Sequence, residues 1–585
     1  MRIGLVRLSI FALVVGLVAG FGAVLFRDLI GIIHNIAFRG LLAVDYDASL
    51  FTPRSPWGAF VILVPVVGGA IVTFLITKFA PEARGHGVPE VMDAIYYREG
   101  QIRPVVAVIK SLASALSIGT GASVGREGPI IQIGAALGSM LGQMVRLAPW
   151  QRITLVASGA GAGIAATFNT PIGGVMFAIE LLMPELSART FLPVALATGT
   201  ATFIGRIFFG LHPAFAVPNA LLASRAPAPL VALVLYALLG ALIGVAAAGF
   251  IRGLSFAESA FERVGNPYLR NFIGMLIVGV LIYALFVSSG HYFVEGVGYS
   301  TIQAILNGDL GLPALLALLF AAKLVATSVS IGSGASGGIF SPSLFMGATL
   351  GGAFGLLVNA IHPMPSFGVT TCAIVGMAAM VGGGTGAAMT AVTMIFEMTR
   401  DYDLVMPSII AVALAIGIRR LLSLENIYTI KLVGRGHFVP KALHANMFLV
   451  RRACEVMQKE VTVLPADADF DGFLREHASE AGFRHVVVTR GSHIAGVVRV
   501  NTSLRRGDEQ AYSGVHLGDV TQRKFTIARE NDIMFDVVQR MTRRDAAMAV
   551  VVKDRGRGRP AEIIGIIAKE HIADSVAESI RPFGK

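Results

Sequence analysis

Apolar residues fill long runs in the first 440 positions of the chain, and short polar or glycine-rich turns separate these runs. The run 8–26 lies between Arg7 and Arg27 and is long enough to cross the ~30 Å hydrocarbon core of a bilayer as a helix. This pattern predicts an all-α polytopic membrane body. Further helices are predicted at 57–80, 105–118, 130–144, 153–168, 172–183, 191–211, 229–250, 272–288, 314–329, 343–360, 370–381, 387–398 and 405–418.

Several of these runs are too short to cross a bilayer, and glycine or proline interrupts them. Short helices are tolerated at membrane depth only where they are buried in protein or line a watery cavity. Transporters use such half-helices to surround a binding site. We therefore expect broken half-helices around an ion or solute site inside the body.

The body contains an internal repeat. Residues 119–142, GTGASVGREGPIIQIGAALGSMLG, align with residues 332–355, GSGASGGIFSPSLFMGATLGGAFG, at an offset of 213. A second match, at an offset of 217, places a segment that ends at Glu180 over one that ends at Glu397. Glycine-rich membrane helices also match by chance, because small residues serve helix packing. Two ordered matches of nearly equal offset favour two related halves, about 1–215 and 225–435. Charge bias does not decide their orientation, and an inverted pair is the expectation for such a body.

The last part of the chain, 441–585, alternates between strand-like and helix-like segments. Segments 483–490 and 494–500 predict two strands around a turn at 491–492. Segments 546–554 and 562–570 repeat this pattern around a loop at 556–560, and helical periodicity occurs at 466–480 and 530–544. An α/β domain of two packed βαββ-like units is expected.

Composition changes the picture by separating the two regions. The whole chain is 54% hydrophobic and 15% charged, which argues against a soluble enzyme, since soluble chains carry about 25% charged residues. Charged residues make up about 10% of the first 440 positions and about 29% of the remainder. The net charge of +11 does not indicate a nucleic-acid partner, because the basic and acidic residues are intermixed. Cys372 and Cys454 lie in different regions without metal-ligand spacing, so we expect no metal site.

Glu127 is the most informative acidic residue in the body, because it lies in Gly-Arg-Glu-Gly-Pro at the start of an apolar run. Proline suits the first turn of a helix, and a helix N-terminus attracts anions through its free N–H groups and partial positive charge. A carboxylate there can occupy the anion's position and leave it when it is protonated or displaced. The alternative is a capping glutamate.

Two other segments have the same helix-start pattern. Gly-Gly-Ile-Phe-Ser-Pro, 337–342, would direct the amides of Ile339 and Phe340 toward the same site, and Gly-His-Gly-Val-Pro, 85–89, precedes a further helical stretch. Packing turns between helices are the alternative. Three such helix starts in a body with few charged residues favour an anion site in which helix dipoles offset the negative charge of the anion.

These three segments resemble the signature segments of the CLC family of chloride channels and proton-coupled chloride exchangers, in order as well as in content. The resemblance implies a homodimer in a cell membrane, with one anion pathway in each subunit. It also implies that Glu127 gates the pathway and that the backbone amides of Arg126, Gly128, Ile339 and Phe340 surround the bound anions. Tyr428, in Asn-Ile-Tyr-Thr, matches the pore tyrosine of the family.

The tail, 450–577, resembles the paired CBS domains that follow many CLC bodies, with units at about 450–505 and 516–577. It is therefore expected in the cytoplasm. Nucleotide-binding CBS domains tend to carry Ser or Thr and then Asp after the last strand, whereas this chain has Ala568-Lys569-Glu570-His571. A structural or regulatory module without nucleotide is favoured, and no cofactor is expected.

The chain departs from the family pattern at two positions. His86 stands where chloride-selective members usually carry serine, and a histidine can donate a hydrogen bond or titrate near neutral pH. Leu181 follows Phe177-Ala178-Ile179-Glu180, where exchangers usually carry an internal proton-transfer glutamate. Channels of the family also have an apolar residue there.

We therefore predict a CLC-type chloride channel, with passive anion conduction gated by Glu127. The alternative is a proton-coupled anion exchanger on the same scaffold. A CBS-regulated divalent-cation channel is a more distant alternative, because cation sites need clustered oxygen ligands and the acids Glu127, Glu180 and Glu397 are scattered. An enzyme is not expected, because the body lacks a paired His, Ser or Asp constellation.

Overall fold

The computed structural model describes residues 3–211, 214–217, 230–361, 367–439, 447–476, 484–500, 514–554 and 562–580. The chain divides into two compact units, Met1–Val439 and Pro440–Lys585. The loop expected at 556–560 and the end of the helix expected at 466–480 lie outside the described residues. Each unit is described by itself.

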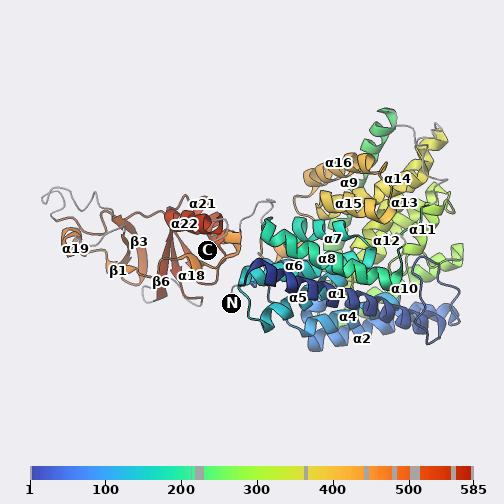
Figure 1. The fold of residues 1–585 in the computed structure, drawn as a ribbon, viewed down its shortest axis with the longest axis horizontal. Helices are drawn as coiled ribbons and strands as arrows, with labels where there is room; N and C mark the ends of the chain where they lie inside the picture. The colour runs from blue at the N-terminus through green and yellow to red at the C-terminus, as the bar shows by residue number, and fades with distance from the viewer. Residues whose placement is uncertain are drawn as a thin grey trace. The chain divides into compact units, whose positions relative to one another are not determined.

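The first unit is a bundle of helices of very unequal length (Figure 1). Its first half holds α1 Leu5–His34, α2 Val64–Phe79, α3 Val88–Tyr97, α4 Val105–Gly119, α5 Glu127–Met144, α6 Pro149–Phe168, α7 Pro171–Phe177 and α8 Ala188–Phe209. Short π-helical turns extend α1 over Asn35–Arg39 and α7 over Ala178–Leu182, and a 3-10 turn, Gly58–Leu63, precedes α2.

The second half repeats this order of helices. It holds α9 Leu230–Glu262, α10 Pro267–Ser289, α11 Tyr299–Asn307, α12 Pro313–Ser333, α13 Phe340–Ile361, α14 Val369–Thr385, α15 Ala388–Thr399 and α16 Val405–Leu422, followed by α17 Thr429–Gly434. Contacts repeat as well, since α5 packs on α6 and α1 on α8, while α13 packs on α14 and α9 on α16. The two expected halves are therefore present.

Glycine packing explains part of the sequence repeat. A Cβ atom on Gly134 of α5 would lie 2.1 Å from the carbonyl oxygen of Gly159 in α6, and a Cβ atom on Gly347 of α13 would lie 2.4 Å from that of Gly376 in α14. Such distances exclude any side chain, so the backbones approach as closely as small residues permit. The glycines are needed in both halves for the same helix pair.

Among the described residues, eight helices are long and apolar enough to cross a membrane. The short helices α3, α7, α11 and α15 lie between them in the chain, as the interrupted runs indicate, and α17 follows the last of them. The first helix is longer than the expected 8–26, and α9 likewise extends past the expected 229–250.

The second unit consists of two strand–helix–strand–strand repeats. The first contains β1 Thr462–Pro465, α19 Phe470–Glu476, β2 Arg484–Arg490 and β3 His493–Val500, and the second β4 Phe525–Arg529, α21 Met534–Arg543, β5 Met548–Val552 and β6 Ile563–Ala568. Three further elements, η6 Met447–Val450, α18 Ala453–Val456 and α22 Lys569–Ile580, flank them. In each sheet the first strand pairs parallel with the second and the second pairs antiparallel with the third.

Alternating apolar residues hold the two repeats of the second unit together. Val487 and Val497 of the first sheet form a buried cluster with Met548, Val550 and Ile566 of the second. The chain before β1 also pairs with β6, since the N–H groups of Gln458 and Ile566 donate to each other's carbonyl oxygens at 2.9 and 3.1 Å. The prediction of two packed βαββ-like units is confirmed.

Candidate anion site

The three helix starts that the sequence singles out meet at one place in the first unit. Gly125 and Gly338 form an antiparallel bridge, with N–H···O distances of 2.7 and 2.6 Å. Gly85 joins the same network, because its N–H donates to Ala335 at 3.2 Å and its carbonyl accepts from Gly337 at 3.3 Å. Helices α5 and α13 therefore begin beside each other.

The Glu127 carboxylate lies between these two helix starts and is fully buried. One oxygen, Oε1, accepts a hydrogen bond from the Tyr299 hydroxyl. The other, Oε2, accepts from the backbone N–H of Ser341 at 3.2 Å and from the Ser341 hydroxyl at 2.5 Å. A negative group thus occupies the point where orphan N–H groups and helix dipoles favour an anion. We call this point the anion position.

His86 and Tyr428 lie together, although they are far apart in the chain. Both side chains are 1% exposed, and their ring centroids are 5.8 Å apart. The His86 carbonyl lies against Gly128, where an added Cβ would come within 2.2 Å of it. Within the described part of the chain, the buried Nδ1 of His86 has no hydrogen-bond partner. A polar atom in this condition is able to serve a ligand.

The remaining expected residues surround Glu127. The Arg126 guanidinium lies over the Tyr299 ring, 5.1 Å from its centroid, with Nε 4.0 Å from Oε1 of Glu127. Ile339 and Phe340 are buried directly before Ser341. Gly128 packs so closely that a Cβ on Gly338 would lie 2.6 Å from its nitrogen. That the amides of these residues hold an anion stays a prediction.

Two fully buried lysines support the loops that lead to the short helices α3 and α11. Lys110 of α4 donates to the carbonyls of Ala83 and Gly85 at 2.9 and 2.7 Å. Lys323 of α12 donates to Val294 and Gly296 at 3.2 and 2.8 Å. The lysines are 213 positions apart, which is the offset of the repeat.

Glu180 and Glu397 each cap the N-terminus of a short helix in the opposite half of the body. Glu397, in α15, accepts from the N–H groups of Ile172 and Gly173 at the start of α7, at 3.1 and 2.7 Å. Glu180, in the π-helical turn after α7, accepts from Met389 at 3.2 Å and from the N–H and hydroxyl of Thr390 at 2.8 Å each, at the start of α15. Such reciprocity is what a twofold relation between the two halves produces.

Leu181 lies beside Glu180 in the same π-helical turn and is 8% exposed. Its side chain is apolar and buried, so this position offers no group that titrates. The neighbouring Glu180 carboxylate already accepts three hydrogen bonds at the start of α15.

Sequence reasoning missed two residues at the anion position, Tyr299 and Ser341. Ser341 lies inside the helix-start segment 337–342, but the sequence argument used only the backbone amides of the two residues before it, Ile339 and Phe340. A signal for Tyr299 was present. Gly296-Val297-Gly298-Tyr299 repeats the pattern of Gly85-His86-Gly87-Val88, and the repeated lysines mark both segments.

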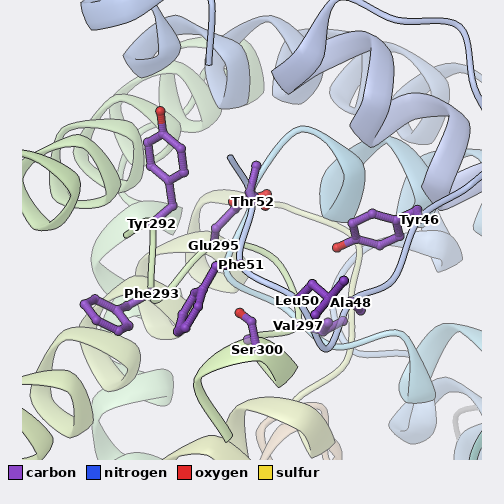
Figure 2. Close-up of a pocket in the computed structure, with 11 residues that line it drawn as sticks. Tyr46, Ala48, Leu50, Phe51, Thr52, Tyr292, Phe293, Glu295, Val297 and Ser300 are labelled. Atoms are coloured by element: carbon purple, nitrogen blue, oxygen red, sulfur yellow. The ribbon is translucent and has the colours of Figure 1, made fainter. Parts of the chain in front are cut away.

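A pocket borders the turn that precedes Tyr299. Figure 2 shows Glu295 among the aromatic side chains of Phe51, Tyr292 and Phe293. The Glu295 carboxylate is close to His34, with Oε1 2.8 Å from Nε2. The pocket also contains Val297, Gly298 and Ser300, so the backbone on either side of Tyr299 forms part of its wall.

Comparison with known proteins identifies the family. Residues 68–420 match the family described as voltage gated chloride channel. The chain belongs to this family, the CLC proteins. A relative from Ralstonia nicotianae, named as a ClcB-like chloride channel protein, is 35% identical over 65% of this chain and 89% of its own length. A relative from Salmonella agona, named H(+)/Cl(−) exchange transporter ClcA, is 33% identical over 68% of this chain and 82% of its own length.

Solved structures agree with the fold. The structure of a slow cyanobacterial Cl−/H+ antiporter matches with a TM-score of 0.64 at 26% identity, over 73% of this chain and 98% of that one. A eukaryotic CLC transporter matches with a TM-score of 0.62 at 21% identity, over 97% of this chain and 98% of that one, and shows the fold alone. The chain is therefore a multi-pass CLC membrane protein, and chloride is the anion that this family transports.

Proposed function

We propose that this CLC protein is a proton-coupled anion exchanger in which Glu127 occupies and vacates the anion position. The observation that carries this proposal is the buried Glu127 carboxylate at the start of α5, within hydrogen-bond distance of the start of α13. Its relatives include named exchangers, which supports exchange over passive conduction.

The mechanism follows from competition for one place. While the Glu127 carboxylate is charged, it satisfies the donors around it, and an anion has no place there. Protonation removes the charge that the helix dipoles stabilise, so the side chain leaves and an anion takes up the free N–H groups. Each visit of Glu127 to the anion position therefore alternates with an anion, and a proton travels with the departing side chain.

A CLC channel is the second candidate function, and Leu181 is the observation that favours it. An apolar residue at this position removes the internal group that exchangers of the family usually protonate. If the protein exchanges, the inner proton must reach Glu127 by another route through the body.

Flux in reconstituted vesicles separates the two functions. Vesicles are loaded with chloride and placed in low chloride, with valinomycin and equal potassium concentrations clamping the voltage near zero. For an exchanger, chloride efflux drives protons inward, and the external pH rises before any protonophore is added. Chloride efflux with a constant external pH until protonophore is added would exclude exchange.

The role of Glu127 is tested in the same vesicles. Glu127→Gln and Glu127→Ala should conduct anions at a rate that does not depend on pH, and neither should move protons. Glu180→Gln serves as the control, since it also removes one buried carboxylate from the body. A pH dependence retained in the Glu127 variants would contradict the assignment.

Two further properties are proposed on the family resemblance. We expect a homodimer with contacts in the membrane body, which crosslinking in native membranes would detect. We also expect the CBS pair to act without a nucleotide. Binding of labelled ATP to the purified full-length protein would contradict that expectation.

A further inference from the structure

Glu127 is held by two hydroxyl groups in addition to backbone N–H. The Tyr299 hydroxyl donates to Oε1 and the Ser341 hydroxyl to Oε2, and the two hydroxyl oxygens are 3.2 Å apart. Tyr299 is 3% exposed, and Ser341 is fully buried. We call Tyr299 and Ser341 the hydroxyl pair. Both oxygens of the carboxylate therefore have a side-chain donor.

The surrounding structure fixes Tyr299 in place. It begins α11 directly after Gly296 and Gly298, which have φ values of 52° and 79°, and this conformation favours glycine. Lys323 ties the turn through the Gly296 carbonyl. The ring packs edge-on against Phe215, with centroids 5.2 Å apart, while the Arg126 guanidinium lies over its face. The hydroxyl is thus held toward Glu127 by contacts on several sides.

The fold itself does not require these hydroxyls. The glycine turns Gly85–Gly87 and Gly296–Gly298, and the first residues of α3 and α11, align Tyr299 with Val88 at an offset of 211. The repeat at an offset of 213 aligns Ser341 with Gly128, and neither counterpart carries a polar side chain. The same helix starts, glycine turns and buried lysines therefore form in the first half without them. The two donors are particular to the half that faces the Glu127 carboxylate.

We propose that the hydroxyl pair determines when Glu127 leaves the anion position, and that the same two groups bind the anion that replaces it. The inference rests on the proposed gating role of Glu127. Hydrogen bonds donated to a carboxylate stabilise its charged form against protonation. When the side chain leaves, the Ser341 N–H loses its acceptor, and only one of the two hydroxyls can donate to the other. A buried donor left in this way is costly unless another acceptor arrives. A small anion meets that need.

The experiment measures chloride flux against pH in vesicles that contain the full-length protein. Tyr299→Phe keeps the ring but removes the donor, so the charged carboxylate loses one of its stabilising hydrogen bonds. The pH of half-maximal flux should rise by about one unit, a tenfold change in proton concentration that corresponds to about 1.4 kcal/mol. Ser341→Ala should shift it in the same direction. Tyr236→Phe, which removes the hydroxyl of another buried tyrosine, should cause no shift.

A second measurement separates this inference from the gating role itself. In the Glu127→Ala background, flux should be independent of pH, and adding Tyr299→Phe should raise the half-saturating chloride concentration several-fold. If Glu127→Ala remains pH-dependent, the gating assignment fails. If it loses pH dependence while Tyr299→Phe and Ser341→Ala keep the wild-type midpoint, the hydroxyl pair has no such role. Should Tyr299→Phe fail to assemble, the Ser341→Ala midpoint decides alone.

Discussion

The reciprocal caps at Glu180 and Glu397 make a prediction that separates a structural carboxylate from a transporting one. Replacing Glu397 by glutamine keeps one side-chain oxygen but removes the charge at the start of α7. The Gly173 N–H at 2.7 Å and the Ile172 N–H at 3.1 Å would then share a single neutral acceptor. Glu180→Gln makes the matching change at the start of α15.

The size of the effect follows from these contacts. Losing an N-terminal cap costs about 0.5–2 kcal/mol, and losing a negative charge beside the helix dipole costs about 0.3–1 kcal/mol. We therefore expect Glu397→Gln to lower the free energy of unfolding by about 1–3 kcal/mol. Glu180→Gln should cost at least as much, because Glu180 also accepts from the Thr390 hydroxyl at 2.8 Å.

Thermal denaturation in detergent, followed by size-exclusion chromatography, measures this loss, and vesicle flux measures function in the same preparations. Both variants should lose their monodisperse peak at a temperature several degrees below wild type while keeping the pH dependence of flux. Wild-type thermal stability in both variants would refute the capping role. Loss of pH dependence in either variant would show that its carboxylate takes part in proton movement.

Two further predictions concern histidines. Burial lowers the pKa of His485 and His571 in the tail below the usual 6.5, and their ring centroids are 5.6 Å apart. The contribution of the two neutral histidines to stability is complete above about pH 6.5 and is lost as pH falls through the lowered pKa values. Hydrogen exchange in β2, corrected for intrinsic rates, should therefore become faster as pH falls. The His485→Phe variant should show a weaker dependence of exchange on pH. In the body, His86→Ser should change the chloride-to-nitrate flux ratio by about tenfold, the effect of one hydrogen bond to a charged ligand, and an unchanged ratio would show that His86 does not contact the anion.

The sequence predicted the helix starts well, because their chemistry is local. Glycine, proline and a charged residue at fixed spacing determine where α5 begins, and Glu127 is indeed its first residue. The βαββ units of the tail could be predicted equally well, since strand alternation and turn residues are local patterns. The repeat also identified Glu180 and Glu397 as counterparts, but not that each one caps the other half.

Features that depend on distant partners could not be predicted in this way. The run expected at 8–26 stops at the first charged residue, whereas α1 continues to His34. That extension is stabilised by Glu295, 261 positions away, whose carboxylate lies 2.8 Å from His34 Nε2. The role of Tyr299 could not be predicted for the same reason, because it depends on a contact with Glu127 in the other half of the body.

The crossed caps also impose an order on the making of the protein. The start of α7 is synthesised 225 residues before its cap, Glu397. At about 5–20 residues per second, the ribosome needs about 10–45 s to cover that distance. During this interval α7 has no cap, and Glu180 lacks its donors from α15. The first half therefore reaches its final structure only when nearly the whole body has been translated.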